Sequence, residues 1–238
     1  MAIDKKNKIL FIHPDKCAGK SIEQQLFNFT WGSGMRGSHH YHLDAGHYFG
    51  DDTFQHSQVR SDEIDDYYKF VVVRNPWDRC VSRYLDAQRR FNVKEKNFQE
   101  YLGRWYKSIP TRKDWYAQAN CIDMISIDGL AVEFSGEILS IDGEIKMERI
   151  IRFENLKDDW HLLLQDLYSH TGDKSWLEKE LIHINKNKGE ELPTFEKKTY
   201  VIGDYHSLYN EYTINMVGEM YDIDIKYWGY TYHWWLFQ

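Results

Sequence analysis

Apolar and polar positions along the chain predict short strands that alternate with amphipathic helices. Residues 8–13 and 70–73 are apolar runs of strand length, and Ile150–Phe153 is a further strand. Apolar residues at helical spacing follow the first run from Ile22, and a helix is expected after Asn75. Strands that alternate with helices favour a parallel sheet with ligands at the carboxyl ends of the strands. The pattern therefore predicts an α/β fold.

The remaining segments fit this architecture. Further helices are expected over residues 76–107, with a break near Asn92, and over residues 155–170 and 204–220. Asn155 is the expected cap of the helix over residues 155–170. Residues 132–145 alternate around two glycines and predict a small hairpin. Polar or Gly- and His-rich stretches predict loops over residues 30–48 and 184–203 and at the start of residues 111–126.

The most informative stretch is residues 69–84, which read KFVVVRNPWDRCVSRY. The apolar run stops at Arg74, and a helix should start there. Helices that begin beside a strand end offer unpaired N–H groups and a positive dipole end to an anion. Arg74 adds a planar charged fork suited to phosphate, and Ser82 adds a hydroxyl on the same side. This stretch therefore predicts a phosphate-binding site.

A second anion site is expected after the first strand. The loop Pro14–Ser21 reads PDKCAGKS and lies between a strand and a helix, the layout that cradles phosphates. It nearly satisfies the Walker A pattern, but Pro14 stands where the first glycine belongs. Two such sites in one domain indicate a nucleotide with separate 5′ and 3′ phosphate groups.

These motifs resemble those of the sulfotransferases that use 3′-phosphoadenosine 5′-phosphosulfate (PAPS), and most closely the carbohydrate (family 2-like) branch. That family opens with F-I-H-x-P-K-T-A-G-T-S, and Phe11–Ser21 fits in register. Its second motif, R-[DN]-P-[YFW]-x-R-x-x-S-x-Y, matches Arg74, Asn75, Pro76, Trp77, Arg79, Ser82 and Tyr84. The resemblance implies a P-loop-type three-layer sandwich, with a central, mainly parallel sheet flanked by helices.

Weaker similarities and some departures complete the comparison with that family. Arg152–Leu156 resembles its R-F-E-[DN]-L segment, residues 182–186 its H-x-N segment, and residues 221–230 its closing Y-x-x-D…[FW]-G-Y. The family has proline at the position of Asp15, a threonine at Cys17 and a hydroxyl residue at Lys20. Lys20 keeps the local charge positive, so anion binding remains the expectation.

The resemblance also implies roles for individual residues. Lys16 would offset charge on the leaving group, and the rest of its loop would bind the 5′-phosphosulfate. Arg74 and Ser82 would bind the 3′-phosphate, while Arg79 serves either the nucleotide or a structural ion pair. The expected binding residues are Lys16, Cys17, Ala18, Gly19, Lys20, Ser21, Arg74 and Ser82.

The general base is expected in the loop between the two phosphate motifs. Related enzymes carry a Gly-His pair there, and His47 follows Gly46. Histidine has a suitable unperturbed pKa for this task. The neighbouring histidines at 39, 40 and 42 compete for the role, and Asp44 is a further alternative. No Cys-x-x-Cys pair or His-x-x-x-His spacing indicates a metal site, so no metal is expected.

Length and composition fit one sulfotransferase-like domain over residues 1–238. The net charge of −7 argues against a general nucleic-acid binder. No apolar run of membrane-spanning or secretory type is present, and the three cysteines are expected to be reduced thiols, so a cytoplasmic location is predicted. Oligomeric state, acceptor identity and source are not encoded in any pattern we recognise.

The predicted activity is sulfuryl transfer from PAPS to an acceptor hydroxyl by in-line displacement, with adenosine 3′,5′-bisphosphate as the nucleotide product. The acceptor is expected to be a glycan or another sugar-containing molecule. Two alternatives remain open. A P-loop kinase would use Gly19-Lys20-Ser21 but lacks a Walker B strand that ends in Asp. A non-catalytic nucleotide- or glycan-binding protein on the same fold would not need His47 or Lys16.

Overall fold

The structure is a computed structural model of the full chain, and it describes residues 2–12, 16–27, 66–91, 97–107, 140–141, 144–145, 147–181 and 205–232. The chain divides into two compact units. The first consists of Met1–Val73 and Cys121–Asn185, and the second of Arg74–Asn120 and Lys186–Gln238. The described part of the first unit contains a sheet and its helices, whereas that of the second is helical. The single domain expected over residues 1–238 stays a prediction.

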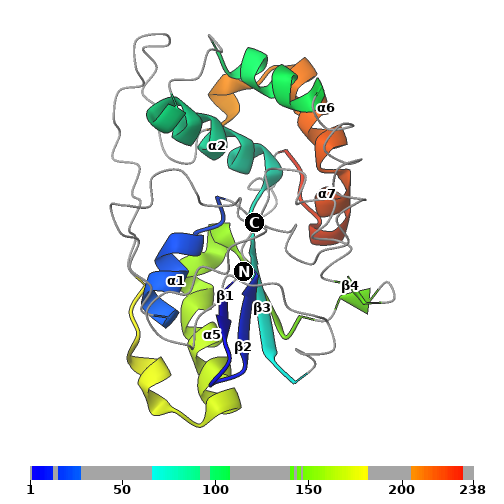
Figure 1. Cartoon of the computed structure of the whole chain (residues 1–238). Helices are drawn as coiled ribbons and strands as arrows, with labels where there is room; N and C mark the ends of the chain where they lie inside the picture. The colour runs from blue at the N-terminus through cyan, green and yellow to red at the C-terminus, as the bar shows by residue number, and fades with distance from the viewer. Residues whose placement is uncertain are drawn as a thin grey trace, which may run out of the picture. The chain divides into compact units, whose positions relative to one another are not determined.

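The sheet of the first unit is mainly parallel (Figure 1). Its strands lie in the order β1 (Ala2–Asp4), β2 (Ile9–Ile12), β3 (Tyr68–Val73) and β6 (Arg149–Arg152). β2, β3 and β6 pair in parallel, and β1 pairs with β2 antiparallel. This arrangement confirms the predicted α/β class. β1 was not predicted, because a strand of three residues in a polar stretch leaves no periodic signal.

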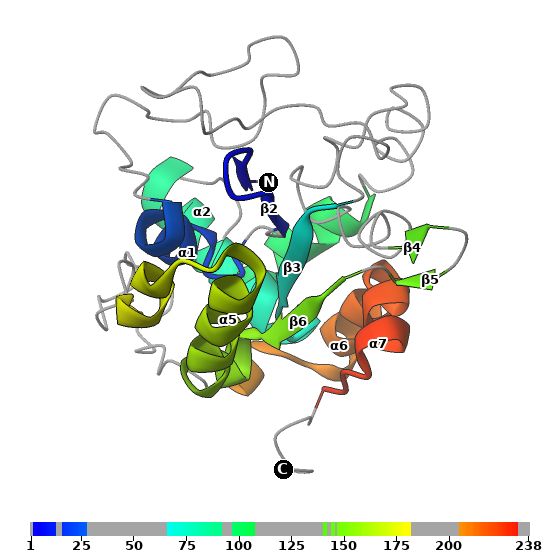
Figure 2. The ribbon, with the colours of Figure 1, turned by 90° about the horizontal axis from the view of Figure 1, so that it is seen from below.

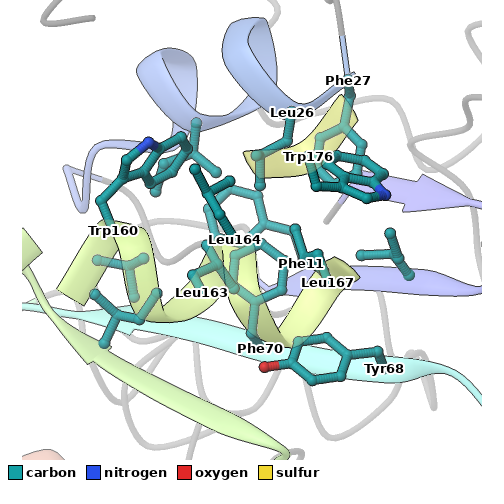
Figure 3. Close-up of a cluster of buried hydrophobic side chains, with 14 of the residues drawn as sticks. Phe11, Leu26, Phe27, Tyr68, Phe70, Trp160, Leu163, Leu164, Leu167 and Trp176 are labelled. Atoms are coloured by element: carbon teal, nitrogen blue, oxygen red, sulfur yellow. The ribbon is translucent and has the colours of Figure 1, made fainter. Parts of the chain in front are cut away.

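Helices α1 (Gly19–Phe27) and α5 (Leu156–Thr171) cover one face of this sheet, and the core lies between them and the strands (Figure 3). Phe11 of β2 and Phe70 of β3 stack with their ring centroids 4.7 Å apart. Apolar side chains of the two helices close over these rings, and they are Ile22, Leu26, Phe27, Leu156, Trp160, Leu163, Leu164 and Leu167.

The opposite face of the central strands is buried as well. β3 lies between β2 and β6 (Figure 2), and all six of its residues are buried. Leu10, Val71 and Val73, which alternate with the core residues, are at most 3% exposed. Strands that are buried on both faces read as continuous apolar runs, and this explains why the sequence signal for β2 and β3 is strong.

The third parallel strand leads into α5 through a short 3-10 helix, η3 (Phe153–Asn155). Leu156 N–H bonds to the Phe153 carbonyl, so one helix runs directly into the next. The side chain of Asn155 makes no capping hydrogen bond, which corrects the expected cap. At its other end α5 stops at Gly172, whose φ of 74° is the left-handed conformation that glycine adopts without strain.

The hairpin of the first unit is confirmed in part. β4 (Ser140–Ile141) and β5 (Glu144–Ile145) pair antiparallel, as the alternation in residues 132–145 predicted. The start of that range lies outside the described residues, as do the segments expected to be loops at 30–48 and 184–203 and the whole of residues 111–126.

The second unit contains α2 (Pro76–Phe91) and a helix over residues 98–107, which confirms that the predicted stretch is largely helical. The break expected near Asn92 lies outside the described residues. The unit also contains α6 (Glu211–Met220) and α7 (Asp222–Trp228). No helix in the described part of the chain has the length and apolar character needed to cross a membrane.

The helix expected over residues 204–220 is two elements. The 3-10 helix η5 (Tyr205–Leu208) ends before Asn210, and Asn210 caps α6. Its side chain accepts a hydrogen bond from Thr213 N–H, and the Thr213 hydroxyl accepts one from Asn210 N–H. This reciprocal capping box starts a new helix, because it satisfies two N–H groups that have no partner inside the helix.

Candidate functional site

The loop between β2 and α1 contains two non-glycine residues with positive φ. Lys16 has a φ of 67° and Ala18 a φ of 61°, whereas Cys17 between them has no positive φ. Left- and right-handed residues in alternation turn successive N–H groups towards one side and form an anion-binding concavity of the kind found in P-loops. A left-handed conformation costs a non-glycine residue about 1–2 kcal/mol, so the surrounding structure must hold this loop.

Helix α1 begins where this loop ends. The Ala18 carbonyl accepts hydrogen bonds from Ser21 N at 2.9 Å and from Ile22 N at 3.2 Å. The N–H groups of Gly19 and Lys20 therefore belong to the first turn, where a helix supplies no carbonyl partner. The first turn contains no acidic residue, so no carboxylate in it offsets the positive end of the helix dipole.

Of the six predicted residues, Lys16 to Ala18 lie in the connection between strand and helix, and Gly19 to Ser21 form the first turn of α1. Cys17 is fully buried and belongs to the hydrophobic core, so it anchors the loop. Ser21 is buried, whereas Lys16 and Lys20 are half-buried. The buried thiol explains how a cysteine takes the place of the family's threonine, because the side chain at this position packs into the core.

Sequence reasoning missed the residue that holds the other end of α1. Lys179 Nζ donates a hydrogen bond to the Gln25 carbonyl at 2.9 Å, in the last turn of a helix that has no basic residue there. The ammonium lies 5.2 Å from the centroid of the Trp176 ring, and the Lys179 carbonyl accepts from Trp160 Nε1 at 3.0 Å. Burial lowers the pKa of Lys179, with Asp173 opposing. A cation at a helix C-terminus satisfies its carbonyls and its dipole.

The second phosphate motif forms the start of α2. Asn75 is the N-cap: its Oδ1 accepts from Trp77 N at 3.0 Å, and its carbonyl accepts from Arg79 N at 2.8 Å. Pro76 takes the first helical position, where its fixed φ suits the helix and its missing N–H is not needed. Asn75 Nδ2 also donates to the Thr231 carbonyl at 3.1 Å. The Arg-Asn-Pro sequence is thus a helix-start signal.

Arg74 is oriented by an ion pair within the motif. Its Nε donates to Asp78 Oδ2 at 2.8 Å, and the two side chains are 10% and 12% exposed. Ser82 is buried and lies one turn beyond Asp78 on the same helix face. Arg74 therefore lies two residues before the helix whose second turn carries Ser82.

Arg79 has the structural role that the sequence left open. Its Nη1 lies 3.7 Å from Asp224 Oδ2 of α7, and its guanidinium carbon lies 5.8 Å from the centroid of the Tyr221 ring. Arg83 stacks over the Trp105 ring at 4.0 Å. Tyr221 and Asp224 belong to the closing sequence motif, so that motif supports the second phosphate motif through Arg79.

Several expected site residues lie outside the described residues. They are the proposed base His47, the competing histidines at 39, 40 and 42, and Asp44. Their roles stay predictions. Within the described ranges, no group of three or more His, Cys, Asp or Glu side chains could hold a metal ion.

The thiols of the described residues are Cys17 and Cys80, and both are free and buried. Burial raises the pKa of Cys80 to about 11, with a hydrogen bond from Tyr221 and the nearby arginines opposing. Such a thiol is protonated at neutral pH and is a poor nucleophile. These two cysteines therefore serve packing.

Comparison with known proteins gives one match. A family model described as "Sulfotransferase family" matches residues 1–231. Searches of curated proteins and of solved structures gave no match. The matched range contains the loop at Lys16, the motif at Arg74 and the closing motif.

Proposed function

The chain belongs to the sulfotransferase family, and we propose on that premise that it transfers a sulfuryl group from PAPS to an acceptor hydroxyl on a carbohydrate. The observation that carries the proposal is the loop at Lys16–Ala18, with its two positive φ values, which leads directly into α1. We also infer that the sheet is the centre of a P-loop-type three-layer sandwich, and the burial of β3 on both faces supports this.

The residues of the first unit suit the 5′ end of the donor. When bound, PAPS supplies the sulfuryl group, and its 5′-phosphate is the leaving group. The N–H groups of Gly19 and Lys20 and the loop residues before them would bind the phosphosulfate oxygens. The ammonium of Lys16 would offset the negative charge that develops on the bridging oxygen. A half-buried lysine suits this task, because a drier setting strengthens its interaction with charge.

The residues of the second unit suit the 3′-phosphate. Arg74 presents a guanidinium that Asp78 already orients, and an oriented fork loses less freedom when it binds a phosphate. The hydroxyl of Ser82 would donate a further hydrogen bond. This assignment explains why both motifs are present: a nucleotide with phosphate groups at two positions requires two grips.

His47 is our choice for the general base that removes the proton of the acceptor hydroxyl. It takes that proton as the oxygen attacks sulfur in line with the departing phosphate. Asp44 and the neighbouring histidines remain the competing bases. Loss of sulfate transfer in His47→Ala, with transfer retained in His42→Ala and Asp44→Asn, would assign the role to His47.

A P-loop kinase is less well supported than a sulfotransferase. Gly19-Lys20-Ser21 fits a kinase, but the strand next to β2 runs through Val73 into Arg74 and supplies no Walker B aspartate at that point. A binding protein without catalysis would keep the two phosphate grips and would show no transfer of sulfate.

The test is isothermal titration of the wild type with adenosine 3′,5′-bisphosphate and, separately, with ATP–Mg²⁺. Micromolar binding of the bisphosphate and weaker binding of ATP support the proposal. Arg74→Ala should weaken the bisphosphate by about tenfold or more, because hydrogen bonds to charged groups contribute about 1.5–3 kcal/mol. Arg104→Ala is the matched control, since Arg104 is an exposed arginine of the same unit. Tight ATP binding without bisphosphate binding would refute the proposal.

A further inference from the structure

Two successive carbonyls near the C-terminus are held by side chains from distant parts of the second unit. Asn75 Nδ2 donates to the Thr231 carbonyl at 3.1 Å, and the Tyr205 hydroxyl donates to the Tyr232 carbonyl at 2.7 Å. Thr231 and Tyr232 are called the C-terminal strap below. The strap is thereby fixed at one side to the start of α2 and at the other side to η5.

The ring of Tyr232 strengthens this attachment. It packs edge-on against the Trp77 ring, with centroids 5.8 Å apart and planes at 75°. Trp77 is held independently, because Tyr209 donates to its carbonyl at 2.9 Å and its Nε1 donates to the Ile214 carbonyl at 3.1 Å. The first turn of α2 is therefore held by the strap, by Tyr209 and by Ile214 of α6.

Asn75 is the residue that joins the strap to the phosphate motif. Its Oδ1 caps α2 by accepting from Trp77 N, while its Nδ2 donates to the strap. The two bonds need an acceptor and a donor on one short side chain, and only the amide of asparagine supplies both at this length. An aspartate would still cap the helix but would set a carboxylate oxygen against the Thr231 carbonyl.

We propose that the C-terminal strap is a positioning element for the 3′-phosphate: through Asn75 it fixes the backbone from which Arg74 reaches the phosphate. The inference rests on the proposed function of Arg74. A guanidinium binds phosphate best with two parallel hydrogen bonds, and a shift of about 1 Å in its backbone weakens such a pair. The Nε of Arg74 donates to Asp78, and the position of its guanidinium also depends on the backbone that carries it.

The test compares two ligands that differ only in the 3′-phosphate, adenosine 3′,5′-bisphosphate and adenosine 5′-monophosphate. The dissociation constant of the monophosphate divided by that of the bisphosphate is the ratio that measures the contribution of the 3′-phosphate. Tyr205→Phe removes the hydroxyl that holds the strap and leaves the side chains of Arg74 and Asn75 themselves unchanged. We expect it to reduce the ratio about fivefold, the equivalent of one lost hydrogen bond, and to leave binding of the monophosphate unchanged.

Tyr106→Phe is the matched control, because it removes a tyrosine hydroxyl that donates to Glu219 elsewhere in the same unit. It should leave the ratio unchanged. Tyr232→Ala removes the ring contact with Trp77 and should reduce the ratio further, by about tenfold. Thermal unfolding establishes that each variant is folded before titration.

Three results would overturn the inference. In the first, folded Tyr205→Phe and Tyr232→Ala bind both ligands with the wild-type dissociation constants. In the second, both variants weaken the two ligands equally, as a merely structural role predicts. In the third, the wild type itself shows no preference for the bisphosphate. Only the third also refutes the proposed function, so the two failures are distinguishable.

Discussion

Arg79 Nη1 and Asp224 Oδ2 lie 3.7 Å apart, and neither side chain is more than 6% exposed. This pair ties the second phosphate motif to the closing motif of the chain, although the two are far apart in sequence. Tyr221, from the same closing motif, places its ring 5.8 Å from the guanidinium carbon. A motif arginine that is charge-paired and buried in this way supports the helix in which it lies.

Asp224→Asn should lower the free energy of unfolding by about 3–5 kcal/mol, because it removes the carboxylate charge that faces a buried guanidinium. Urea unfolding of the wild type and the variant measures this difference. Glu219→Gln is the control: Glu219 is an acceptor in an exposed hydrogen bond of the same unit, and its loss should cost less than about 1 kcal/mol. Equal effects of the two variants would contradict a stabilising buried pair.

The double variant Arg79→Met with Asp224→Leu sharpens the same prediction. It replaces both charges by apolar groups, and it should recover much of the stability that Asp224→Asn loses, because desolvation of the two charges is no longer required. Failure of the double variant to exceed Asp224→Asn in stability would contradict this explanation, which attributes the loss to an uncompensated buried charge.

The stability of the first unit should depend on pH through Asp166. Burial raises the pKa of this carboxyl, but hydrogen bonds from Arg149 and from Tyr68, whose hydroxyl lies 2.6 Å away, outweigh burial and leave the pKa below 3.8. A depressed carboxyl pKa stabilises the folded state above the unfolded pKa. That contribution is lost as the pH falls through the folded pKa.

Asp166→Asn should therefore be less stable than the wild type at neutral pH, by about 1–2 kcal/mol for a partly exposed charged network. The difference in free energy of unfolding between the wild type and this variant should narrow as the pH falls below 3.8, the ordinary pKa of the carboxyl. Urea unfolding across the acidic range measures it. Tyr68→Phe, which removes one donor, should show a smaller gap with the same sign, and a gap that is constant with pH would contradict the assignment.

Cys17 and Cys80 should resist alkylation in the native protein. They are 0% and 1% exposed, and burial raises the pKa of the Cys80 thiol to about 11. Mass spectrometry after treatment with iodoacetamide at mildly alkaline pH should find both cysteine peptides unmodified, and modified once urea is added. Labelling of the Cys80 peptide at the rate of a free thiol would show that α2 opens readily.

The left-handed conformation of Ala18 predicts opposite effects of glycine and valine at this position. Ala18→Gly relieves about 1–2 kcal/mol of backbone strain in the folded state. It also lowers the free energy of unfolding by about 0.4–1 kcal/mol, because glycine makes the unfolded chain more flexible. It should stabilise the protein slightly and keep its affinity for adenosine 3′,5′-bisphosphate. Ala18→Val places a β-branched residue at positive φ, so both stability and affinity should fall. Equal behaviour of the two variants would contradict the left-handed conformation of Ala18.

The elements with local causes could be predicted from the sequence. The apolar run before Arg74 becomes β3, and Asn75 with Pro76 starts α2, because capping and proline geometry act over a few residues. The loop at Lys16 was expected for the same reason. Asn155 shows the limit of such rules: it stands at a helix start, but the preceding 3-10 turn supplies the bonds that a cap would make.

The contacts that hold these elements could not be predicted from the sequence. Lys179 with Gln25, Asn75 with Thr231, and Arg79 with Asp224 join residues that are far apart along the chain, and a single sequence records no pairing between them. The sequence left two roles for Arg79, nucleotide binding and a structural ion pair, because an arginine suits either equally well. Burial and the position of its partner decided between them.

The placement of β3 between two parallel neighbours has a consequence for hydrogen exchange. All six residues are buried, β2 pairs with Tyr68–Val71, and β6 pairs with Phe70–Val73, so Phe70 and Val71 have a strand on both sides. Amides at the centre of such a strand exchange with solvent only when the surrounding unit opens as a whole. The chain passes from Val73 directly to Arg74, so the phosphate motif begins at the covalent end of one of the slowest-exchanging segments of the protein.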